Sequence, residues 1–594
     1  METKNLLQEI KPLINSQVSE LLGIPHPPSE LVIQRTKPEF EGDYTLVLFG
    51  IVKKYKKNPD EFGQALGSAL CKVHPTLFKN FNVVKGFLNL SIDDSFWINF
   101  LNRSYTNTSF GSHSLIGKKV MVEYSSPNTN KPLHLGHLRN IFLGWSIAEI
   151  LNYCGYEVIK SCVVNDRGIH ICKSMIAWQL FANGATPSST GQKGDHFVGD
   201  YYVRFNEEFK KQIEELVSKG RSPAEAEKEA PIMKATQQLL IDWEAGKKEV
   251  LDLWNQMNDW VYEGFDSTYK KIGADFQKTY YESKTYLLGK KFVEQGLTDG
   301  VFYQKEDGST WINLTNDGLD EKLVLRKDGT SVYITQDLGL AEQKFVEFQF
   351  DQSIYVIADE QNYHMKVLQL ILQKLGKSYA NGIYHLSYGM VELPSGRMKS
   401  REGSVVDADD LIDEMLQVAK QKTEELGKVK DFTEKELSEL YNTLALGALK
   451  FYLLRVDPKK KMIFNPQESI DFQGFTGPFV QYTHARICSI LRKAGELPKT
   501  LSTTTLEKEE RELLVSLEQF PLVVEQAVEE HNPSVVANYA YTIAKSFNGF
   551  YTKYSIMQAP TEESKAFRLR LSKLTGQVIK NSLALLGIQA PERM

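Results

Sequence analysis

The chain has 594 residues, of which 42% are hydrophobic and 24% charged, and its formal net charge is −5. This length exceeds what one hydrophobic core usually serves, so we expect about three or four domains, and the composition excludes a disordered chain. No apolar run approaches the roughly 20 residues that cross a bilayer, and the amino terminus has no secretory hydrophobic core, which predicts a cytoplasmic protein without a membrane span.

The cysteines are widely spaced, odd in number and form no Cys-x-x-Cys pair, which argues against a disulfide framework and against a structural zinc site. We expect them to be buried free thiols. The acidic net charge does not indicate a nucleic-acid binder, although lysine clusters at 53–57 and 457–462 leave either local binding or a solvated surface open. The cysteines are Cys71, Cys154, Cys162, Cys172 and Cys488.

Residues 1–112 are predicted to form a small α+β domain with its own core. An amphipathic helix comes first, followed by the polar turn "EFEGDY" at residues 39–44 and the apolar run "VVKGFLNLSI". The stretch "TNTSFGSHS", which is rich in Gly, Ser, Thr and Asn and lacks periodicity, then marks the domain boundary.

Residues 113–400 alternate strand and helix patterns. "KKVMVEYS" indicates a short buried strand, "LRNIFLGWSIAEILNY" has helical periodicity and ends at Gly155, and "YEVIKSCVVND" indicates the next strand. A strand, loop, helix and strand within about 45 residues form a βαβ unit, the building block of a parallel doubly wound sheet. Such sheets bind ligands at the carboxyl ends of their strands.

A charged, helical insertion over about residues 183–272 interrupts this alternation. The pattern resumes with the strand "QSIYVIAD", a helix that ends at Gly376, the strand "IYHLSYGMVEL" and the loop "PSGRMKSREGS". Residues 401–470 are predicted to form a connecting helical region and residues 471–594 an all-α bundle.

The stretch "NTNKPLHLGHLRN" at residues 128–140 follows the first strand of the predicted sheet. His134 and His137 could bind a metal, but zinc needs a third protein ligand that this turn lacks. They could instead simply cap a helix start. A third interpretation explains more features together: backbone N–H groups, both imidazoles and the ammonium of Lys131 would donate to a phosphate, and Gly136 would leave room for an adenosine.

The tetrapeptide "HLGH" resembles the HIGH motif of class I aminoacyl-tRNA synthetases, and "VEYSSPNTNKPLHLGHLRN" resembles its arginyl-tRNA synthetase version. The segment "GRMKSREG" at residues 396–403 is similar to a degenerate KMSKS motif, the second hallmark of the class. Arg397 takes the place of the first lysine, Met398 matches, Lys399 takes the place of the serine, and Ser400 takes that of the second lysine. In the family a lysine just before HIGH supplies the missing charge, and Lys131 stands there.

Segments in the same order along the chain extend the resemblance from "EGDY" to the terminus. They are "KDGTSVYITQDLGLA", "YVIADEQNYH", "GPFVQYTHARICSILRKAG" and "LLGIQAPERM". The resemblance implies a Rossmann-like α/β catalytic domain with insertions between an amino-terminal α+β domain and a carboxyl-terminal helical bundle.

The resemblance also implies ATP, Mg²⁺, L-arginine and tRNA(Arg) as ligands, with tRNA needed even for adenylate formation. It assigns catalysis to His134, His137, Lys131, Lys399 and Arg397. It assigns ATP binding to His134, Gly136, His137, Met390, Met398, Lys399 and Ser400.

A pocket for arginine should offer hydrogen-bond acceptors to a planar guanidinium. Tyr333 and Asp337 are four residues apart, so on a helix both point one way, although a half-buried tyrosine and a surface aspartate would be the ordinary interpretation. By resemblance they contact the arginine side chain together with Gln361. The remaining residues that the resemblance assigns to arginine binding are Glu123, Ser126, Asn128 and Asn89.

The carboxyl-terminal helices should read the anticodon, where unpaired bases stack on aromatic rings. The residues placed there by resemblance, each of which could equally be a core residue, are Tyr482, Phe547, Asn548, Tyr551 and Met594. The first domain resembles the arginyl-specific addition that grips the tRNA elbow, and the family expectation is a monomer.

Rival functions of two kinds remain to be weighed: another class I synthetase and an RNA-binding paralogue without catalysis. A cysteinyl enzyme would want zinc ligands and a glutamyl enzyme a cationic pocket, and the residues above supply neither. An RNA-binding paralogue without catalysis is disfavoured because His134, Gly136, His137 and Lys131 are intact.

Overall fold

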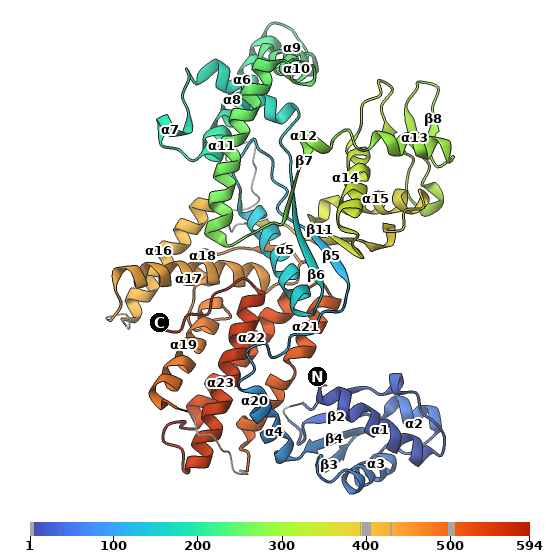
Figure 1. Ribbon diagram of the computed structural model, residues 1–594, viewed down its shortest axis with the longest axis vertical. Coiled ribbons are helices and arrows are strands. Elements are labelled where there is room, and N and C mark those ends of the chain that lie inside the picture. Colours follow the sequence, from blue (N-terminus) through green and yellow to red (C-terminus); the bar gives the residue numbers. More distant parts are fainter. Residues whose placement is uncertain (1–4, 38, 393, 395–405, 428–430, 497–504) are drawn as a thin grey trace.

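The computed structural model describes residues 5–37, 39–392, 394, 406–427, 431–496 and 505–594. Figure 1 shows an amino-terminal domain (blue) beside the carboxyl-terminal helices (orange to red), with the central sheet above them. Two lobes rise from this sheet: the helices α6 to α11 and the smaller lobe around α13 and β8 (Figure 1).

The amino-terminal domain is an antiparallel sheet, in the order β1-β2-β4-β3, packed against helices. This confirms the predicted α+β unit. Its elements are α1 (Leu6–Leu22), β1 (Ile33–Arg35), β2 (Tyr44–Val47), α2 (Phe49–Tyr55), α3 (Pro59–Val73), β3 (Phe78–Val84), β4 (Phe87–Ile92) and α4 (Asp94–Ser104).

The "EGDY" turn holds this domain against α20 (Lys508–Glu518) of the carboxyl-terminal part. Asp43 Oδ2 accepts a hydrogen bond of 2.9 Å from Arg511 Nη1, and the Tyr44 hydroxyl donates to Glu518 Oε2 at 2.8 Å. Both Asp43 and Tyr44 are buried. The turn is therefore a domain contact, and the gripping of a tRNA elbow by this domain stays a prediction.

The central domain contains a five-stranded parallel sheet in the order β12-β11-β5-β6-β7, as the βαβ pattern predicted. Val120 and Val122 of β5 share a core with α5, whereas Met121 between them shares a second core with α14 and α15. Both faces of the sheet are therefore covered, which is typical of parallel sheets. The elements are β5 (Lys119–Glu123), α5 (Leu135–Tyr153), β6 (Glu157–Val164), β7 (Lys278–Tyr281), α14 (Tyr333–Phe348), β11 (Gln352–Ala358), α15 (Asn362–Lys374) and β12 (Ile383–Tyr388).

The two lobes are insertions between strands of this sheet. One, between β6 and β7, is helical, and the other, between β7 and β11, carries a small antiparallel sheet that the sequence analysis did not predict. The helical lobe comprises α6 (Ile169–Phe181), α7 (Pro187–Thr190), α8 (Gly194–Ser218), α9 (Pro223–Glu229), α10 (Pro231–Glu244) and α11 (Lys248–Ile272). The second comprises α12 (Glu282–Thr285), α13 (Lys290–Thr298), β8 (Tyr303–Gln304), β9 (Thr310–Ile312) and β10 (Lys322–Leu325).

The prediction of one continuous strand over "IYHLSYGMVEL" was wrong. β12 ends at Tyr388, and β13 (Val391–Glu392) pairs instead with β14 (Met462–Ile463) outside the main sheet. The backbone N–H of Gly389 donates to the Pro458 carbonyl at 2.9 Å, and a Cβ at Gly389 would clash with the segment that follows Pro458. This close backbone crossing draws the chain away from the sheet edge.

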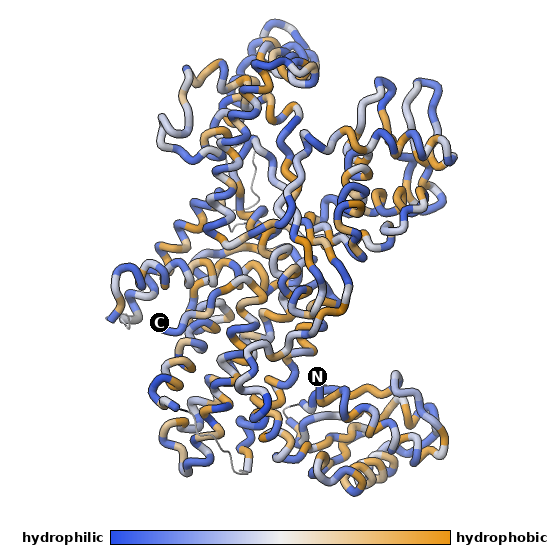
Figure 2. The backbone as a smooth tube through the Cα atoms, viewed as in Figure 1, coloured by the Kyte–Doolittle hydropathy of each residue, from blue (hydrophilic) through white to orange (hydrophobic). Residues whose placement is uncertain are grey.

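The carboxyl-terminal part is helical, as predicted, apart from the short strand β14, and several of its helices pack against α5. Figure 2 shows hydrophobic segments gathered in the central sheet and in the helices below it. No helix within the described ranges is both long and apolar enough to cross a membrane. The helices are α16 (Ala408–Leu426), α17 (Glu434–Leu454), α18 (Pro466–Ser469), α19 (Gly477–Ala494), α20, α21 (Phe520–Glu529), α22 (Ser534–Lys553) and α23 (Glu562–Leu585).

Candidate active site

The "HLGH" segment caps the amino terminus of α5. The helix begins at Leu135, so His134 is the N-cap residue and His137 the third residue of the helix. The backbone N–H of Gly136 donates to His134 Nδ1 at 3.1 Å, and the backbone N–H of His134 donates to His137 Nδ1 at 3.1 Å. These bonds satisfy donors that lack partners at a helix start. The cap occupies one nitrogen of each ring and leaves the other for a ligand.

This capping fixes the protonation state of both imidazoles. Because each Nδ1 accepts a backbone N–H, the proton of each neutral ring lies on Nε2. Burial, with a smaller contribution from the charge of Lys131, lowers the pKa of His134 to about 3, and burial holds the pKa of His137 well below its usual value. Near neutral pH both rings are therefore uncharged, and each has one Nε2–H donor at the positive end of α5.

Gly136 makes room for this arrangement. A Cβ at this position would lie 2.9 Å from Cε1 and 3.1 Å from Nδ1 of His134. Any other residue would therefore push the His134 ring away from its capping position. This reason for the glycine is additional to the room for adenosine predicted from the sequence.

The loop between β5 and α5 is held in an unusual conformation. Ser125 and Ser126 have φ angles of 77° and 46°, in the left-handed region. The Ser125 N–H donates to Asn140 Oδ1 at 2.5 Å, and Asn128 forms a parallel bridge with Asn165 after β6. Such backbone conformations persist where the surroundings fix them, often at functional sites. Ser126 and Asn128 thus lie at the carboxyl edge of the sheet.

Lys131 and His134 line a cavity of about 210 Å³ whose other wall is helix α8. Burial lowers the pKa of Lys131 below its usual value. No carboxylate of the described ranges forms an ion pair with Lys131, so none of these residues neutralises its ammonium. The residues of the α8 wall include His196, Asp200 and Tyr202, and Asp407 closes the cavity from the start of α16.

The second signature lies outside the described residues: Arg397, Met398, Lys399 and Ser400 all fall between residues 394 and 406. The segment that follows it is described and touches the first signature. The Leu135 N–H donates to the Val406 carbonyl at 3.1 Å, and the Ala408 N–H donates to the Leu133 carbonyl at 3.0 Å. Met390, before the second signature, accepts at its carbonyl a hydrogen bond of 3.5 Å from the Arg139 guanidinium.

Two residues predicted to bind arginine lie on the first turns of α14. The helix begins at Tyr333, which confirms the helical spacing of Tyr333 and Asp337. Tyr333 is 73% exposed, and Asp337 Oδ2 lies 2.6 Å from His364 Nε2. Gln361 is exposed after β11. Tyr333 and Gln361 are thus exposed, whereas the half-buried Asp337 is already paired with His364.

Glu123 has a partner that the sequence analysis did not foresee. Its carboxylate forms an ion pair with Lys344 of α14, and both side chains are buried. The ammonium of Lys344 also lies 4.4 Å from the ring centroid of Tyr355 on the neighbouring strand β11. Glu123 thus ends β5 beside α14, with one carboxylate oxygen bound by a buried cation.

Asn89 is not brought to this edge. It lies on β4 in the amino-terminal domain, which Figure 1 shows apart from the end of β5. Its side chain is buried, accepting a hydrogen bond of 2.6 Å from Thr45 and donating one of 2.7 Å to Asn82. The placement of Asn89 near the arginine pocket is therefore corrected: its amide is used in hydrogen bonds to the two neighbouring strands of the amino-terminal sheet.

Glu282 is a candidate that the sequence analysis missed. It follows Tyr281, the last residue of β7, and so lies on the same carboxyl edge. Burial, with the charges of Asp166 and Asp337 adding and that of Arg167 opposing, raises the pKa of Glu282 to about 7. A half-buried carboxyl group in the field of two other carboxylates would gain from a bound cation. The sequence feature that could have indicated Glu282 is its position directly after the short run "KTYY".

Three of the predicted tRNA contacts line a second cavity, of about 780 Å³, in the carboxyl-terminal helices. Tyr482, Tyr551 and Met594 lie on its wall. The Arg486 guanidinium lies 4.9 Å from the ring centroid of Tyr482 and 5.5 Å from that of Tyr551. Further cations on the wall are Arg492, Lys493 and Arg593.

The other two predicted tRNA contacts do not line this cavity. Phe547 is fully buried in the helical core, so the core interpretation holds for it. Asn548 accepts a hydrogen bond from Arg486 and donates one of 2.8 Å to Thr483. Asn548 therefore holds the arginine that lies over the two tyrosine rings.

Models of known protein families match three successive parts of the chain. Residues 104–465 match the model described as "tRNA synthetases class I (R), catalytic domain", residues 480–594 match the "DALR anticodon binding domain", and residues 8–92 match the "Arginyl tRNA synthetase N terminal domain". The parallel sheet with the HLGH helix cap at its carboxyl edge is thus that of a class I aminoacyl-tRNA synthetase.

Comparisons over the whole chain show which family within this class the chain resembles. An arginine–tRNA ligase of Flavobacterium psychrophilum is 50% identical over 99% of this chain and 100% of its own, and one of Bacteroides fragilis is 50% identical over 98% of each chain. The structure of Thermus thermophilus arginyl-tRNA synthetase matches with a TM-score of 0.82 and 26% identity, covering 99% of this chain and 100% of the other. The chain belongs to the arginyl-tRNA synthetase family.

Proposed function

We propose that arginyl-adenylate forms at the carboxyl edge of the five-stranded sheet, where the cap of α5 faces the phosphates of ATP. The chain is an arginine–tRNA ligase: it activates L-arginine with ATP and passes the arginyl group to the 3′-terminal adenosine of tRNA(Arg), releasing AMP and pyrophosphate. The observation that carries the proposed site is the use of both Nδ1 atoms as cap acceptors, which leaves two Nε2–H donors for a ligand.

In the first step a carboxylate oxygen of arginine attacks the α-phosphorus of ATP. The bond from that phosphorus to the bridging oxygen of the β-phosphate breaks, and pyrophosphate leaves with the electron pair. Negative charge builds up on the phosphate oxygens, where fixed donors in a water-poor site are most effective. His134 and His137 would supply these donors without giving up a proton.

The cations around the phosphates would neutralise the leaving pyrophosphate. The described part of the structure supports this role for Lys131, because its half-buried ammonium has no carboxylate partner among the described residues. Arg397 and Lys399 keep the role that the resemblance implies. The carboxylates of Asp200 and Asp407 on the cavity wall would hold a Mg²⁺ ion bound with ATP, which would add positive charge beside the phosphates.

Recognition of arginine would rest on acids around the guanidinium. Tyr333 and Asp337 lie one turn apart on α14, so both would face the guanidinium, and Glu282 adds a carboxyl group from the start of α12. Gln361 and Glu123 border the same edge. Ser126 and Asn128, in the loop after β5, would hold the backbone end of the amino acid.

In the second step the 2′-hydroxyl oxygen of the terminal adenosine attacks the carbonyl carbon of the adenylate, and AMP leaves. The carboxyl-terminal cavity, with Tyr482 and Tyr551 beneath Arg486, would take the anticodon bases by stacking and phosphate pairing. We also propose a cytoplasmic monomer, divided into an elbow-contacting domain (1–112), a catalytic domain (113–400), a connecting region (401–470) and an anticodon domain (471–594).

The test is ATP–pyrophosphate exchange with arginine, run with and without tRNA(Arg), and with citrulline as the uncharged isostere of arginine. We expect exchange that depends on arginine and on tRNA, and none with citrulline. Absence of exchange with arginine and tRNA together would contradict the proposed site. Equal exchange with citrulline would remove the acidic residues from substrate recognition.

A further inference from the structure

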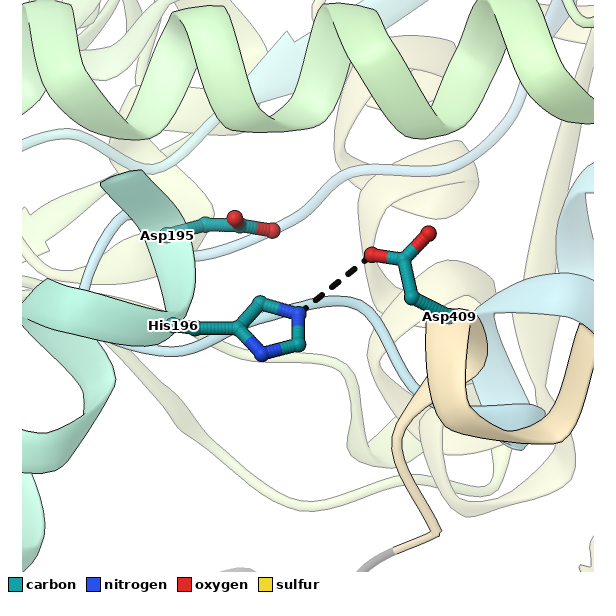
Figure 3. Close-up of side chains that lie close together, drawn as sticks. All are labelled: Asp195, His196 and Asp409. Atoms are coloured by element: carbon teal, nitrogen blue, oxygen red, sulfur yellow. Dashed lines mark hydrogen bonds and ion pairs between the residues drawn. The ribbon is translucent and has the colours of Figure 1, made fainter. Parts of the chain in front are cut away.

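A cluster of charged groups lies between the helical lobe and the start of α16. Figure 3 shows Asp195 and His196 at the beginning of α8 and Asp409 at the beginning of α16, with His196 directed at Asp409. The ligand atoms of these three residues lie within 4.8 Å of one another, which is a metal-like spacing. The position between the two carboxylates is, however, already taken by a protein cation.

That cation is Lys193. Its ammonium donates to Asp195 Oδ2 at 3.0 Å, to Asp409 Oδ2 at 2.7 Å and to the Thr268 hydroxyl of α11 at 2.6 Å. An ammonium has three N–H donors, so Lys193 uses all of them here. A metal ion would have to displace it, and we therefore interpret the cluster as a structural bridge between α8, α11 and α16.

The bridge continues to Asp407. His196 Nε2 lies 3.3 Å from Asp409 Oδ2 and 3.4 Å from Asp407 Oδ2. Asp407 is also the N-cap of α16, where its other oxygen accepts hydrogen bonds from the backbone N–H groups of Asp409 and Asp410. One histidine of the helical lobe thus contacts both acids at the start of α16.

The start of α16 is joined in turn to the catalytic signature. Asp407 and His134 form an antiparallel bridge, with hydrogen bonds on either side of it between residues 133–135 and 406–408. A displacement of Asp407 would therefore move the backbone on which the His134 ring is mounted. Geometry at a reacting centre is sensitive to such displacements, since about 1 Å can cost a factor of about a hundred in rate.

We propose that Lys193 and His196 are positioning residues for adenylate formation: through Asp409 and Asp407 they fix the backbone that carries His134. The inference rests on the proposed role of His134. It assigns Lys193, which does not line the cavity, a part in catalysis without contact with substrate, in addition to the wall that α8 gives to that cavity.

The first variant is Lys193→Met, with Lys271→Met as its matched control. Lys271 of α11 also bridges to α16, donating to Asp413 Oδ1 at 2.6 Å, but four residues beyond Asp409 and away from the signature. We expect Lys193→Met to lower kcat of arginine-dependent exchange about tenfold to a hundredfold with little change in the arginine KM. Lys271→Met should keep kcat within about twofold of the wild type.

A second pair of variants tests the inference independently, in case Lys193→Met does not fold. His196→Leu removes the donor to Asp407 and Asp409, whereas His196→Gln keeps an N–H donor near the same place. We expect a loss of kcat in His196→Leu and its recovery in His196→Gln, at similar melting temperatures. A rescue of this kind would not follow from a role in packing alone.

The outcomes separate the inference from the proposed function. If His134→Ala abolishes exchange but Lys193→Met and His196→Leu keep the wild-type kcat, the inference is overturned and the proposed site stands. If Lys193→Met and Lys271→Met lower the melting temperature equally and neither changes kcat, the bridge is structural only. If His134→Ala itself exchanges normally, the proposed function fails first.

Discussion

The two candidate sites of this chain would offer donors of opposite chemistry to a phosphate-containing ligand. At the cap of α5 the donors are neutral, half-buried imidazoles, each fixed by a backbone hydrogen bond, and His134 borders a cavity of about 210 Å³. In the carboxyl-terminal helices the donors are charged guanidinium and ammonium groups beside partly exposed rings, in a cavity of about 780 Å³.

This difference follows from what each site must do. A transition state gains charge at one place for a short time, so prearranged dipoles that need no reorganisation are effective. A folded RNA carries its charge always and is large, so long-range attraction and broad stacking surfaces suit it better. Variants at the two sites should therefore change different kinetic constants.

The largest effect is expected at the cap of α5. His134→Ala and His137→Ala each remove one Nε2–H donor, and the loss of such a donor typically costs a factor of about 100 to 1,000 in kcat. Exchange kinetics measure this, with tRNA binding by filter retention as the control that should not change. If either variant weakened tRNA binding and left kcat unchanged, the cap of α5 would serve RNA binding and not adenylate formation.

The next largest effect is expected on the KM for arginine. Asp337→Ala removes a carboxylate from the guanidinium, and we expect the arginine KM to rise about a hundredfold, because charge-assisted pairs in such pockets are worth about 3 kcal/mol. Asp320→Ala, which removes an exposed acid of the neighbouring lobe, serves as control. An unchanged arginine KM in Asp337→Ala would take this residue out of the pocket.

A smaller effect is expected in the carboxyl-terminal cavity. Arg486→Ala and Tyr551→Ala should raise the KM for tRNA about tenfold, since stacking of one base is worth about 1–3 kcal/mol, and should leave the arginine KM unchanged. Phe547→Leu, a change in the core beneath the cavity, should lower the melting temperature instead. If it raised the tRNA KM at an unchanged melting temperature, Phe547 would be a contact after all.

The smallest effect is expected in the dependence of kcat on pH. Because the folded-state pKa of His134 is about 3, the ring is neutral at any pH above about 4, and kcat should show no ionisation near pH 6.5 from these histidines. The unfolded chain does take up protons below about pH 6.5, so the free energy of unfolding should fall as pH drops from 6.5 to about 3. A kcat that declines as pH rises through 6.5 would indicate imidazolium donors.

Local patterns predicted the parts of the fold that depend on neighbouring residues. The apolar runs of β5, β6 and β11, the helix that begins at Tyr333 and the position of HLGH after a buried strand all depend on residues close in sequence. The short strands β7 to β10 were missed because two to four residues carry no clear period.

Contacts between distant segments could not be predicted in the same way. Glu123 and Lys344 are 221 positions apart, and no local pattern relates them. The interface role of "EGDY" depends on Arg511 and Glu518, in another domain. The strand before the second signature is broken by a backbone crossing at Gly389, which involves a segment about 70 residues further along the chain. Such packing decides which polar residues remain free for a ligand.

The central claim is that capping holds both signature histidines as neutral Nε2–H donors, and ¹⁵N NMR of histidine-labelled protein tests it most directly. His134→Gln and His137→Gln assign the two signals. At pH 7 we predict, for both rings, a protonated Nε2 and an unprotonated Nδ1 that accepts a hydrogen bond, unchanged between about pH 5 and 8. Two protonated nitrogens on either ring, or a proton on Nδ1, would contradict the account.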